Sequence, residues 1–242
     1  MSNVQQHYET LLADHYTWMF GMPFKDKVAE QAELLSEAGI KVPGVAVDLG
    51  CGSGFQSVAL AKMGADKVYA IDTSEKLLSE LNGHSNGPAI KTICGNLLDF
   101  PSLVPEKPDT IVCMGDTLTH LPTCEAVSEL FRRVSSVLSN CGRFVLSYRD
   151  LTNSPSGLDR FILLNSSRDK IMSCFLERFD DVVRVHDLIY IRGEGEWKLL
   201  KSAYPKLILP LNEIKQELND RGLKLYFEKN QRGMNILALQ RE

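Results

Sequence analysis

The sequence predicts an α/β fold in which a mostly parallel, doubly wound sheet carries helices on both faces. Between about residues 41 and 150, short apolar segments with strand character alternate with amphipathic segments of helical period. The first apolar strand, at 45–49, leads into a turn with glycine at every second position, and the next strand ends on Asp72. A strand, a glycine-rich turn, a helix and a strand with a terminal acid form the first half of a nucleotide-binding βαβ unit.

The chain on the N-terminal side of this unit is expected to be helical. One helix is predicted over residues 4–20, because its apolar side chains recur on one side. A second is predicted over about residues 25–38 and ends at Gly39, a residue that suits the left-handed position after a helix. Residues 1–40 are therefore predicted to form an N-terminal helical cap.

The core of the fold is predicted in residues 41–150. Its strands are expected at about 45–49, 67–71, 90–94, 109–114 and 142–148. Its helices are expected at about 54–63, 74–81 and 123–138. Because these strands are apolar almost throughout, they fit a parallel sheet that is buried on both faces.

The pattern changes after Asp150. Alternating segments separated by turn residues predict an antiparallel insertion over residues 160–205, with strands at about 170–178, 182–192 and 197–204. Residues 206–242 are predicted to complete the sheet with a helix at about 211–220 and an antiparallel pair of strands at 223–228 and 234–240. The chain is thus read as one domain, 1–242, with a Rossmann-like seven-stranded sheet and an insertion after the fifth strand. The insertion either covers a substrate, the favoured interpretation, or makes a dimer contact.

Composition restricts the possible partners. The formal net charge is −4 and the pI is about 5.8, so the chain lacks the basic footprint expected of a nucleic-acid-binding protein. No apolar run is long enough to span a bilayer, and the first residues do not resemble a secretory signal. The 6 cysteines form no C-x-x-C pair, and the 5 histidines show no metal-ligand spacing. We therefore expect a cytoplasmic monomer or homodimer with reduced thiols, no metal, and no nucleic-acid or membrane partner.

The glycine-rich turn discriminates between cofactors. A dinucleotide fingerprint needs a small third residue, whereas Phe55 stands there, and no Gly-Lys-Ser/Thr follows as a Walker A loop would require. Asp48 precedes Gly50 by two residues. A carboxylate there is unfavourable beside a pyrophosphate but suits the positively charged amino or sulfonium group of S-adenosylmethionine.

Five collinear blocks between about residues 40 and 150 carry a family resemblance. They are Asp48-Leu-Gly-Cys-Gly-Ser-Gly54, Tyr69-Ala-Ile-Asp72-Thr-Ser, Cys94-Gly-Asn96-Leu-Leu-Asp-Phe, Asp109-Thr-Ile-Val-Cys113-Met-Gly-Asp116 and Gly142-Arg-Phe-Val-Leu-Ser-Tyr148. In these blocks the chain resembles the class I S-adenosylmethionine-dependent methyltransferases, in their small-molecule branch and loosely the glycine N-methyltransferase-like enzymes. The resemblance implies S-adenosyl-L-methionine as the cofactor and a small molecule as the methyl acceptor.

The resemblance also implies a set of cofactor-binding residues. Asp48 is expected near the methionine end, Asp72 on the ribose hydroxyls, and Thr73 near the adenosine. Asn96 and Leu97 are expected near the adenine, although many relatives have an aspartate at the position of Asn96. The remaining members of the set are Tyr16, Gly50, Cys51, Gly52, Gly54, Phe55, Met114 and Gly115. Tyr16 is chosen from the N-terminal aromatic residues, most of which are expected in the core.

Four residues are candidates for a catalytic role. His120 lies after the fourth strand and is the candidate general base, because imidazole accepts a proton near neutral pH. Its alternative role is to order the loop or to bind the cofactor carboxylate. Asp116 is a candidate for binding a cationic amine. Tyr148 and Arg149 end the fifth strand, where Arg149 either holds a substrate carboxylate or forms a surface salt bridge.

The sequence therefore predicts a methyltransferase that transfers a methyl group to N or O of a small-molecule acceptor. Neither an Asn/Asp-Pro-Pro-Tyr/Phe motif nor a basic surface is present, which disfavours DNA and protein-glutamine acceptors. A catalytically silent S-adenosylmethionine-binding protein is the main alternative. An NAD-dependent oxidoreductase is less favoured, because Phe55 and Asp48 argue against a dinucleotide.

Overall fold

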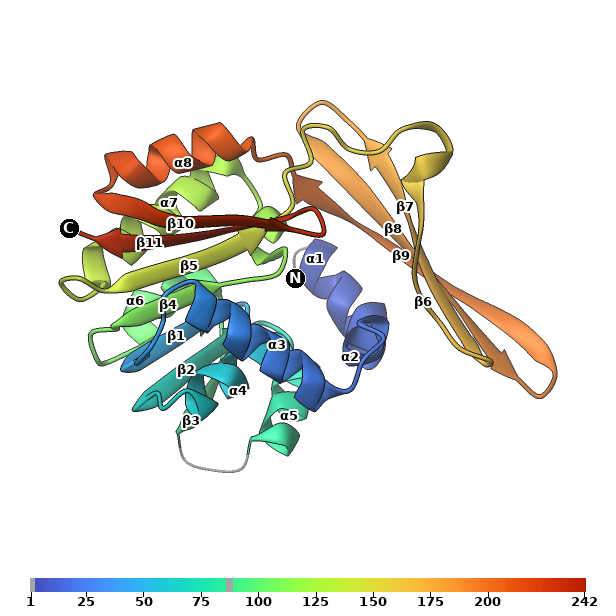
Figure 1. The fold of residues 1–242 in the computed structure, drawn as a ribbon. Coiled ribbons are helices and arrows are strands. Elements are labelled where there is room, and N and C mark those ends of the chain that lie inside the picture. The colour runs from blue at the N-terminus through green and yellow to red at the C-terminus, as the bar shows by residue number, and fades with distance from the viewer. Residues whose placement is uncertain (1–2, 86–88) are drawn as a thin grey trace.

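The computed structural model describes residues 3–85 and 89–242. Its main layer is a seven-stranded sheet with the order β10-β11-β5-β4-β1-β2-β3 (Figure 1). The strands are β1 (Val45–Leu49), β2 (Lys67–Asp72), β3 (Ile90–Cys94), β4 (Thr110–Cys113), β5 (Arg143–Tyr148), β10 (Leu223–Gln231) and β11 (Met234–Arg241). The first five run parallel, while β11 pairs antiparallel with both β5 and β10. The predicted seven-stranded, mostly parallel sheet is confirmed.

Successive residues of each central strand enter two different cores. On one face, Val47 and Phe144 belong to a cluster that includes side chains of α6 (Phe100–Leu103), α7 (Cys124–Val137) and α8 (Leu211–Asp220). On the other face, Ala46 and Val145 pack with side chains of α3 (Phe24–Glu37), α4 (Phe55–Lys62) and α5 (Glu75–His84). Successive side chains of a strand point to opposite faces of the sheet. Because both the odd and the even positions of these strands are apolar, the sheet is buried between two layers of helices.

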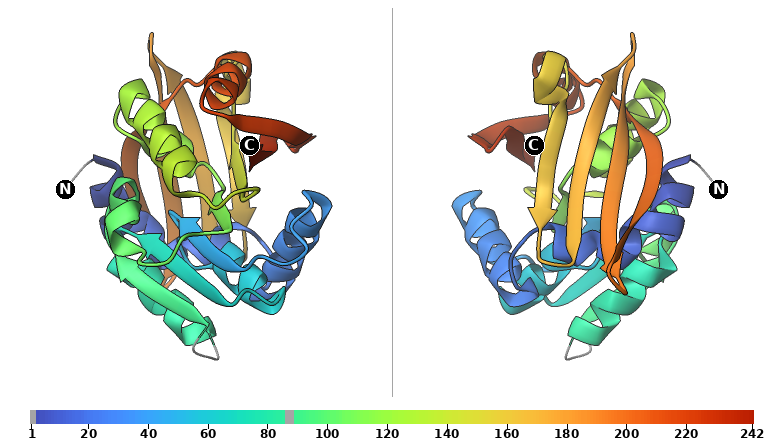
Figure 2. Two further views of the ribbon diagram at one scale, coloured as in Figure 1. Left: turned by 90° about the vertical axis from the view of Figure 1, so that its left-hand side faces the viewer. Right: turned by 90° about the vertical axis from the view of Figure 1, so that its right-hand side faces the viewer.

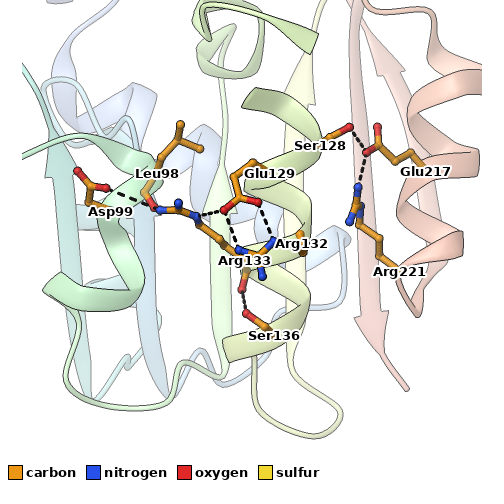
Figure 3. Close-up of polar contacts among 9 residues, drawn as sticks. All are labelled: Leu98, Asp99, Ser128, Glu129, Arg132, Arg133, Ser136, Glu217 and Arg221. Atoms are coloured by element: carbon orange, nitrogen blue, oxygen red, sulfur yellow. Dashed lines mark hydrogen bonds and ion pairs between the residues drawn. The ribbon is translucent and has the colours of Figure 1, made fainter. Parts of the chain in front are cut away.

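Charged side chains join α7 to its neighbours on the outer surface (Figure 3). Glu129 accepts hydrogen bonds from Arg132 at 2.7 Å and from Arg133 at 2.6 Å. Arg133 also donates to the carbonyl of Leu98, and Arg221 of α8 donates to Glu217 at 2.8 Å. Such solvent-exposed pairs are screened by water and add little to stability. The position of α7 therefore rests mainly on its buried apolar side.

The N-terminal segment consists of short helical pieces that lie between the large sheet and the insertion (Figure 1). These pieces are α1 (Asn3–His7), a π-helical turn (Tyr8–Leu12), a 3₁₀ turn (Ala13–His15) and α2 (Tyr16–Met19). Leu11 and Leu12 are buried against Met172 and Ile189 of the insertion. The segment is helical in short pieces, where one helix over residues 4–20 was predicted, and it packs against the insertion.

The insertion is a second, antiparallel sheet with four strands, not the three predicted (Figure 2). They are β6 (Phe161–Ser166), β7 (Lys170–Arg178), β8 (Val182–Gly193) and β9 (Glu196–Leu207). The missing prediction is β6, whose continuous apolar run Phe161-Ile-Leu-Leu164 lacks the alternation of its neighbours. A register shift between Leu163 and Asn165 interrupts its pairing with β7.

The inner face of this second sheet is apolar near its base. Met172 and Cys174 of β7 and Val183 and Val185 of β8 are buried. This face turns toward the N-terminal segment and the carboxyl ends of β4 and β5. The insertion therefore supplies one wall of whatever lies at that edge of the large sheet. No helix in residues 3–85 and 89–242 is long and apolar enough to cross a membrane.

Candidate active site

The turn after β1 can be built only with glycine. Gly50, Gly52 and Gly54 have φ values of 71°, 54° and 91°, in the left-handed region that side chains disfavour. A Cβ on Gly50 would lie 2.3 Å from Cγ2 of Thr117, and one on Gly54 would lie 2.1 Å from Cδ1 of Leu81. The loop is thus shaped by backbone conformation and by close packing at both ends. It opens α4 at the point where the strand order reverses between β1 and β4, which is where open α/β sheets bind ligands.

Asp72 braces this loop from the end of β2. Its Oδ2 accepts a hydrogen bond of 2.8 Å from the amide of Gly52, and its Oδ1 accepts one of 2.9 Å from the amide of Ser74. Burial raises the pKa of the carboxyl, while these amides oppose the shift. Thr73, the next residue, is exposed. The ribose-binding role of Asp72 and the adenosine role of Thr73 stay predictions.

Asp48 lies beneath the loop at the end of β1. Its carboxylate is buried and accepts a hydrogen bond of 2.6 Å from the hydroxyl of Ser57 on α4. Burial raises the pKa of Asp48 to about 7, and the neighbouring Asp72 adds to the shift. A carboxyl with this pKa exchanges its proton near neutral pH. Its ionisation would be favoured by any cationic group that approaches the loop.

A cavity of about 530 Å³ opens beside the glycine loop at the carboxyl ends of β1, β4 and β5. Of the predicted cofactor residues, those that line it are Tyr16, Gly50, Cys51, Phe55, Met114 and Gly115. Of the predicted catalytic residues, those that line it are Asp116, His120 and Arg149. The structure thus brings two groups of predicted residues, from different strands, to one site.

Other predicted residues lie outside this cavity. Gly52, Gly54, Asp48, Asp72 and Thr73 stay behind or beside its wall. Asn96 is exposed, and its side chain accepts a hydrogen bond of 2.9 Å from the amide of Leu98, which starts a 3₁₀ turn (Leu97–Asp99). Leu97 packs partly against the core. The adenine contacts assigned to Asn96 and Leu97 therefore stay predictions.

Tyr148 is not among the residues that line the cavity, and its catalytic role stays a prediction. Its side chain is fully buried in the core cluster on the opposite face of the sheet, with Leu209 and Ile214. The preceding residue, Ser147, lines the cavity instead and accepts a hydrogen bond of 2.9 Å from the amide of Gly115. Neighbouring residues of a strand point to opposite faces, so only one of the pair can face the ligand.

Asp116 is surrounded by cations of the protein itself. Its Oδ2 lies 2.7 Å from Nη1 of Arg149 and 2.6 Å from Nζ of Lys206, while its Oδ1 accepts a hydrogen bond of 3.0 Å from the amide of Arg149. These partners hold the pKa of Asp116 far below its usual range, despite its burial. The carboxylate therefore stays ionised and its oxygens are occupied. This arrangement leaves it poorly suited to the cationic amine that the sequence suggested.

His120 ends a 3₁₀ turn (Thr117–His120) and is surrounded by aromatic rings. Its ring centroid lies 5.8 Å from that of Tyr8 and 5.4 Å from that of Tyr204. Its Nε2 is buried and has no hydrogen-bond partner among the residues that the structure describes. Burial lowers the pKa of His120 to about 3, and Lys206 adds to this effect. The imidazole is therefore neutral at pH 7 and keeps a nitrogen available to an acceptor N–H or O–H.

The N-terminal segment covers the glycine loop. A Cβ on Gly52 would lie 3.2 Å from Cε1 of Tyr16, and the Tyr16 ring stacks on Phe55 with centroids 6.4 Å apart. The hydroxyl of Thr17 donates to that of Ser53 at 3.1 Å. This cradle fits a group that must approach the loop backbone closely while water is excluded.

The insertion contributes residues that the sequence did not indicate. Tyr204 and Lys206 of β9 and Asp187 of β8 line the cavity, as does Tyr8 of the N-terminal segment. Asp187 lies 3.0 Å from Nε2 of His7, and both side chains are buried. Tyr204 and Lys206 are two residues apart on β9, so the sequence indicates that they share one face of the strand. The sequence of the strand does not indicate which face meets the ligand.

No group of three or more His, Cys, Asp or Glu side chains is arranged to hold a metal ion within the described ranges of the chain. The cavity is lined instead by backbone amides, aromatic rings and charged side chains that pair with one another. The seven-stranded sheet and its glycine loop have the Rossmann-like fold of methyltransferases. The solved structure of S-adenosylmethionine-bound CalS10 from Micromonospora echinaspora, an amino pentose methyltransferase, is similar, with a TM-score of 0.76. The likeness covers 95% of this chain and 96% of that one at 14% sequence identity.

Sequence comparison finds a methyltransferase-domain match over part of the chain. Residues 46–142 match the family described as methyltransferase domain. The ribosomal protein L11 methyltransferase of Helicobacter hepaticus is 35% identical over 112 residues, which cover 45% of this chain and 34% of that protein. The ubiquinone biosynthesis O-methyltransferase of Xanthomonas euvesicatoria is 32% identical over 103 residues, which cover 42% and 41% of the two chains. This stretch of the chain is therefore similar to methyltransferase domains, and the matches span 34% and 41% of the length of these two relatives.

Proposed function

We propose that this protein transfers the methyl group of S-adenosylmethionine to a nitrogen or oxygen atom of a small-molecule acceptor. The observation that carries the proposal is the cavity in which the glycine loop meets His120, whose Nε2 is buried without a partner in the described part of the chain. Two relatives support a small acceptor, since one is named for ubiquinone biosynthesis and the other for an amino pentose.

The residues of the chain have distinct tasks in this proposal. The backbone of Gly50 and Cys51 approaches the cofactor, Asp72 binds the ribose hydroxyls, and Asp48 offers a carboxylate to the cationic methionine end. When bound, S-adenosylmethionine supplies an electrophilic methyl group on a sulfonium. Holding the acceptor in line with that group is the main source of rate, because positioning removes most of the entropic barrier.

His120 handles the proton that the acceptor loses. The acceptor N or O forms a bond to the methyl carbon, the bond from carbon to sulfur breaks, and sulfur keeps the electron pair. The acceptor proton goes to Nε2 of His120, a buried nitrogen without a partner among the described residues. Burial lowers the pKa of this imidazole to about 3, so it is neutral but weakly basic, and the neighbouring Asp116 carboxylate is the group that opposes this shift and balances the charge formed. Tyr8, Tyr16 and Tyr204 exclude water from the same space.

Calorimetric titration with S-adenosylmethionine and S-adenosylhomocysteine tests the cofactor assignment. The wild type should bind both at micromolar concentration, and Asp72→Ala should abolish binding. Asp72 also accepts a hydrogen bond from the amide of Gly52, so Asp72→Asn, which keeps the size of the side chain, is measured as a second variant. Thermal unfolding checks that both variants fold. Detection of S-adenosylhomocysteine formation in a screen of small acceptors then tests transfer. A folded wild type that binds neither compound contradicts the proposal.

A further inference from the structure

One part of the cavity is lined by apolar side chains of the insertion and of the segment that leads into it. We call it the acceptor arm and define its apolar wall by Leu151, Met172, Cys174, Leu176 and Val185. All five residues are buried, with less than a tenth of their surface exposed to solvent. An apolar body of a ligand would therefore leave water on entering this arm.

Two cations share one carboxylate in this arm. Lys206 and Arg149 both point at Asp116, at 2.6 Å and 2.7 Å, so one carboxylate serves two cations. An ammonium group has three N–H donors and a guanidinium has five, and Asp116 cannot use all of them. The Lys206 side chain is only 12% exposed, so water compensates little of its charge.

The other acidic side chain in the arm is already paired. Asp187 lies 3.0 Å from Nε2 of His7, with both side chains almost completely shielded from solvent. Neither carboxylate of the arm is thus free to receive an ammonium group, whereas two cations have donors to spare. The spare N–H donors therefore favour an anion beside Lys206 and Arg149.

We propose that the methyl acceptor is an apolar carboxylic acid, whose carboxylate binds Lys206 and Arg149 and whose apolar body lies along the acceptor arm. This inference rests on the proposed transferase function and names its substrate class. Lys206 is then a specificity-determining residue, which comes from the insertion, whereas the cofactor loop comes from the large sheet. The carboxylate is an anchor in this scheme and the nucleophilic N or O lies elsewhere on the acceptor.

Three eight-carbon probes that differ only in their head group test the inference. Octanoate, octylamine and octanol are titrated calorimetrically into the wild type, with and without saturating S-adenosylhomocysteine. Octanoate should bind at least tenfold more tightly than either of the other two. Equal binding of octanoate and octylamine, or no binding of octanoate at millimolar concentration, would overturn the inference.

Variants on one strand localise the anion site. Lys206→Met should weaken octanoate binding at least tenfold, while Lys206→Arg should retain most of it. Lys201→Met is the matched control, because Lys201 lies on the same strand with an exposed side chain and should leave binding unchanged. Octanoate affinity that is equal in Lys206→Met and the wild type would contradict the assignment.

A second variant covers the case in which Lys206→Met does not fold. Cys174→Phe fills the arm without touching Asp116, and it should abolish octanoate binding while S-adenosylhomocysteine binding persists. Unchanged octanoate binding in Cys174→Phe would place the probe elsewhere and overturn the inference. If S-adenosylhomocysteine binds to the wild type and octanoate does not, this inference fails alone. If octanoate binds and neither cofactor form does, the proposed function fails instead.

Discussion

The hydroxyl of Ser57 donates a hydrogen bond of 2.6 Å to Oδ2 of Asp48. The bond ties α4, which follows the glycine loop, to β1, which precedes it. Asp48 is buried, and burial raises the pKa of its carboxyl to about 7. The loop is therefore underlain by an acid that is partly protonated at neutral pH.

Cofactor affinity should depend on pH through Asp48. The carboxyl is protonated below about pH 7, and only its ionised form attracts the cationic methionine end. Binding then releases a proton, so the affinity for S-adenosylmethionine should rise by up to about tenfold per pH unit below pH 7 and level off above it. Calorimetry between pH 5.5 and 8.5 measures this slope. Asp48→Asn should flatten it, and an unchanged slope in this variant would show that another group titrates.

Removal of His120 should slow transfer without weakening cofactor binding. If the imidazole takes the acceptor proton, His120→Ala should lower kcat by about 10²–10⁴-fold. The dissociation constant for S-adenosylhomocysteine should stay within a few-fold of the wild type, because the proposed cofactor contacts come from the glycine loop and Asp72. Steady-state kinetics with an acceptor found in the screen checks the first value and calorimetry the second. Normal turnover in His120→Ala would eliminate the general-base role.

Gly54→Ala should destabilise the protein more than Gly64→Ala. Both glycines have a positive φ, 91° and 88°, so both substitutions strain the backbone by about 1–3 kcal/mol. A Cβ on Gly54 would also lie 2.1 Å from Leu81, whereas one on Gly64 meets nothing within 4 Å. The overpacking adds about 1–3 kcal/mol for Gly54 alone. Urea unfolding of the two variants gives the difference, and equal losses would mean that Leu81 moves aside freely.

Tyr148→Phe should be nearly silent in both stability and activity. The Tyr148 hydroxyl is buried and has no hydrogen-bond partner among the residues described, so its removal should change the free energy of unfolding by less than about 1 kcal/mol. Ser147→Ala provides the contrast, since it removes the acceptor of the Gly115 amide at the cavity wall. Thermal unfolding and turnover should change in Ser147→Ala and not in Tyr148→Phe. A large loss of turnover in Tyr148→Phe would instead support a catalytic role for the Tyr148 hydroxyl.

The contrast between Tyr148 and Ser147 shows where sequence reasoning stops. Local patterns predicted the large sheet well, because each buried strand is an apolar run and the first strand leads into a glycine-rich turn. They did not resolve which of two adjacent residues faces the ligand, since strands that are apolar on both faces carry no alternation. The strand β6 was not predicted for the same reason, because its apolar residues do not alternate with polar ones.

Contacts between distant segments were beyond sequence reasoning altogether. Asp116 and Lys206 are separated by 90 residues, and their ion pair depends on how the insertion folds back over the large sheet. The pairing of His7 with Asp187 spans 180 residues. In contrast, Gly50, Met114, Asp116 and His120 could be placed from sequence, because they all follow carboxyl ends of parallel strands and such ends meet at one edge.

The two sheets that build this site have separate hydrogen-bond ladders in the part of the chain that the structure covers. One ladder fixes the glycine loop, and the other fixes Tyr204 and Lys206. Substitutions on the inner face of β7–β9 can therefore redesign acceptor recognition while the loop backbone keeps its geometry. In an engineering setting, the insertion is an exchangeable module, and its natural boundaries are the connections at Asp150 and Pro210.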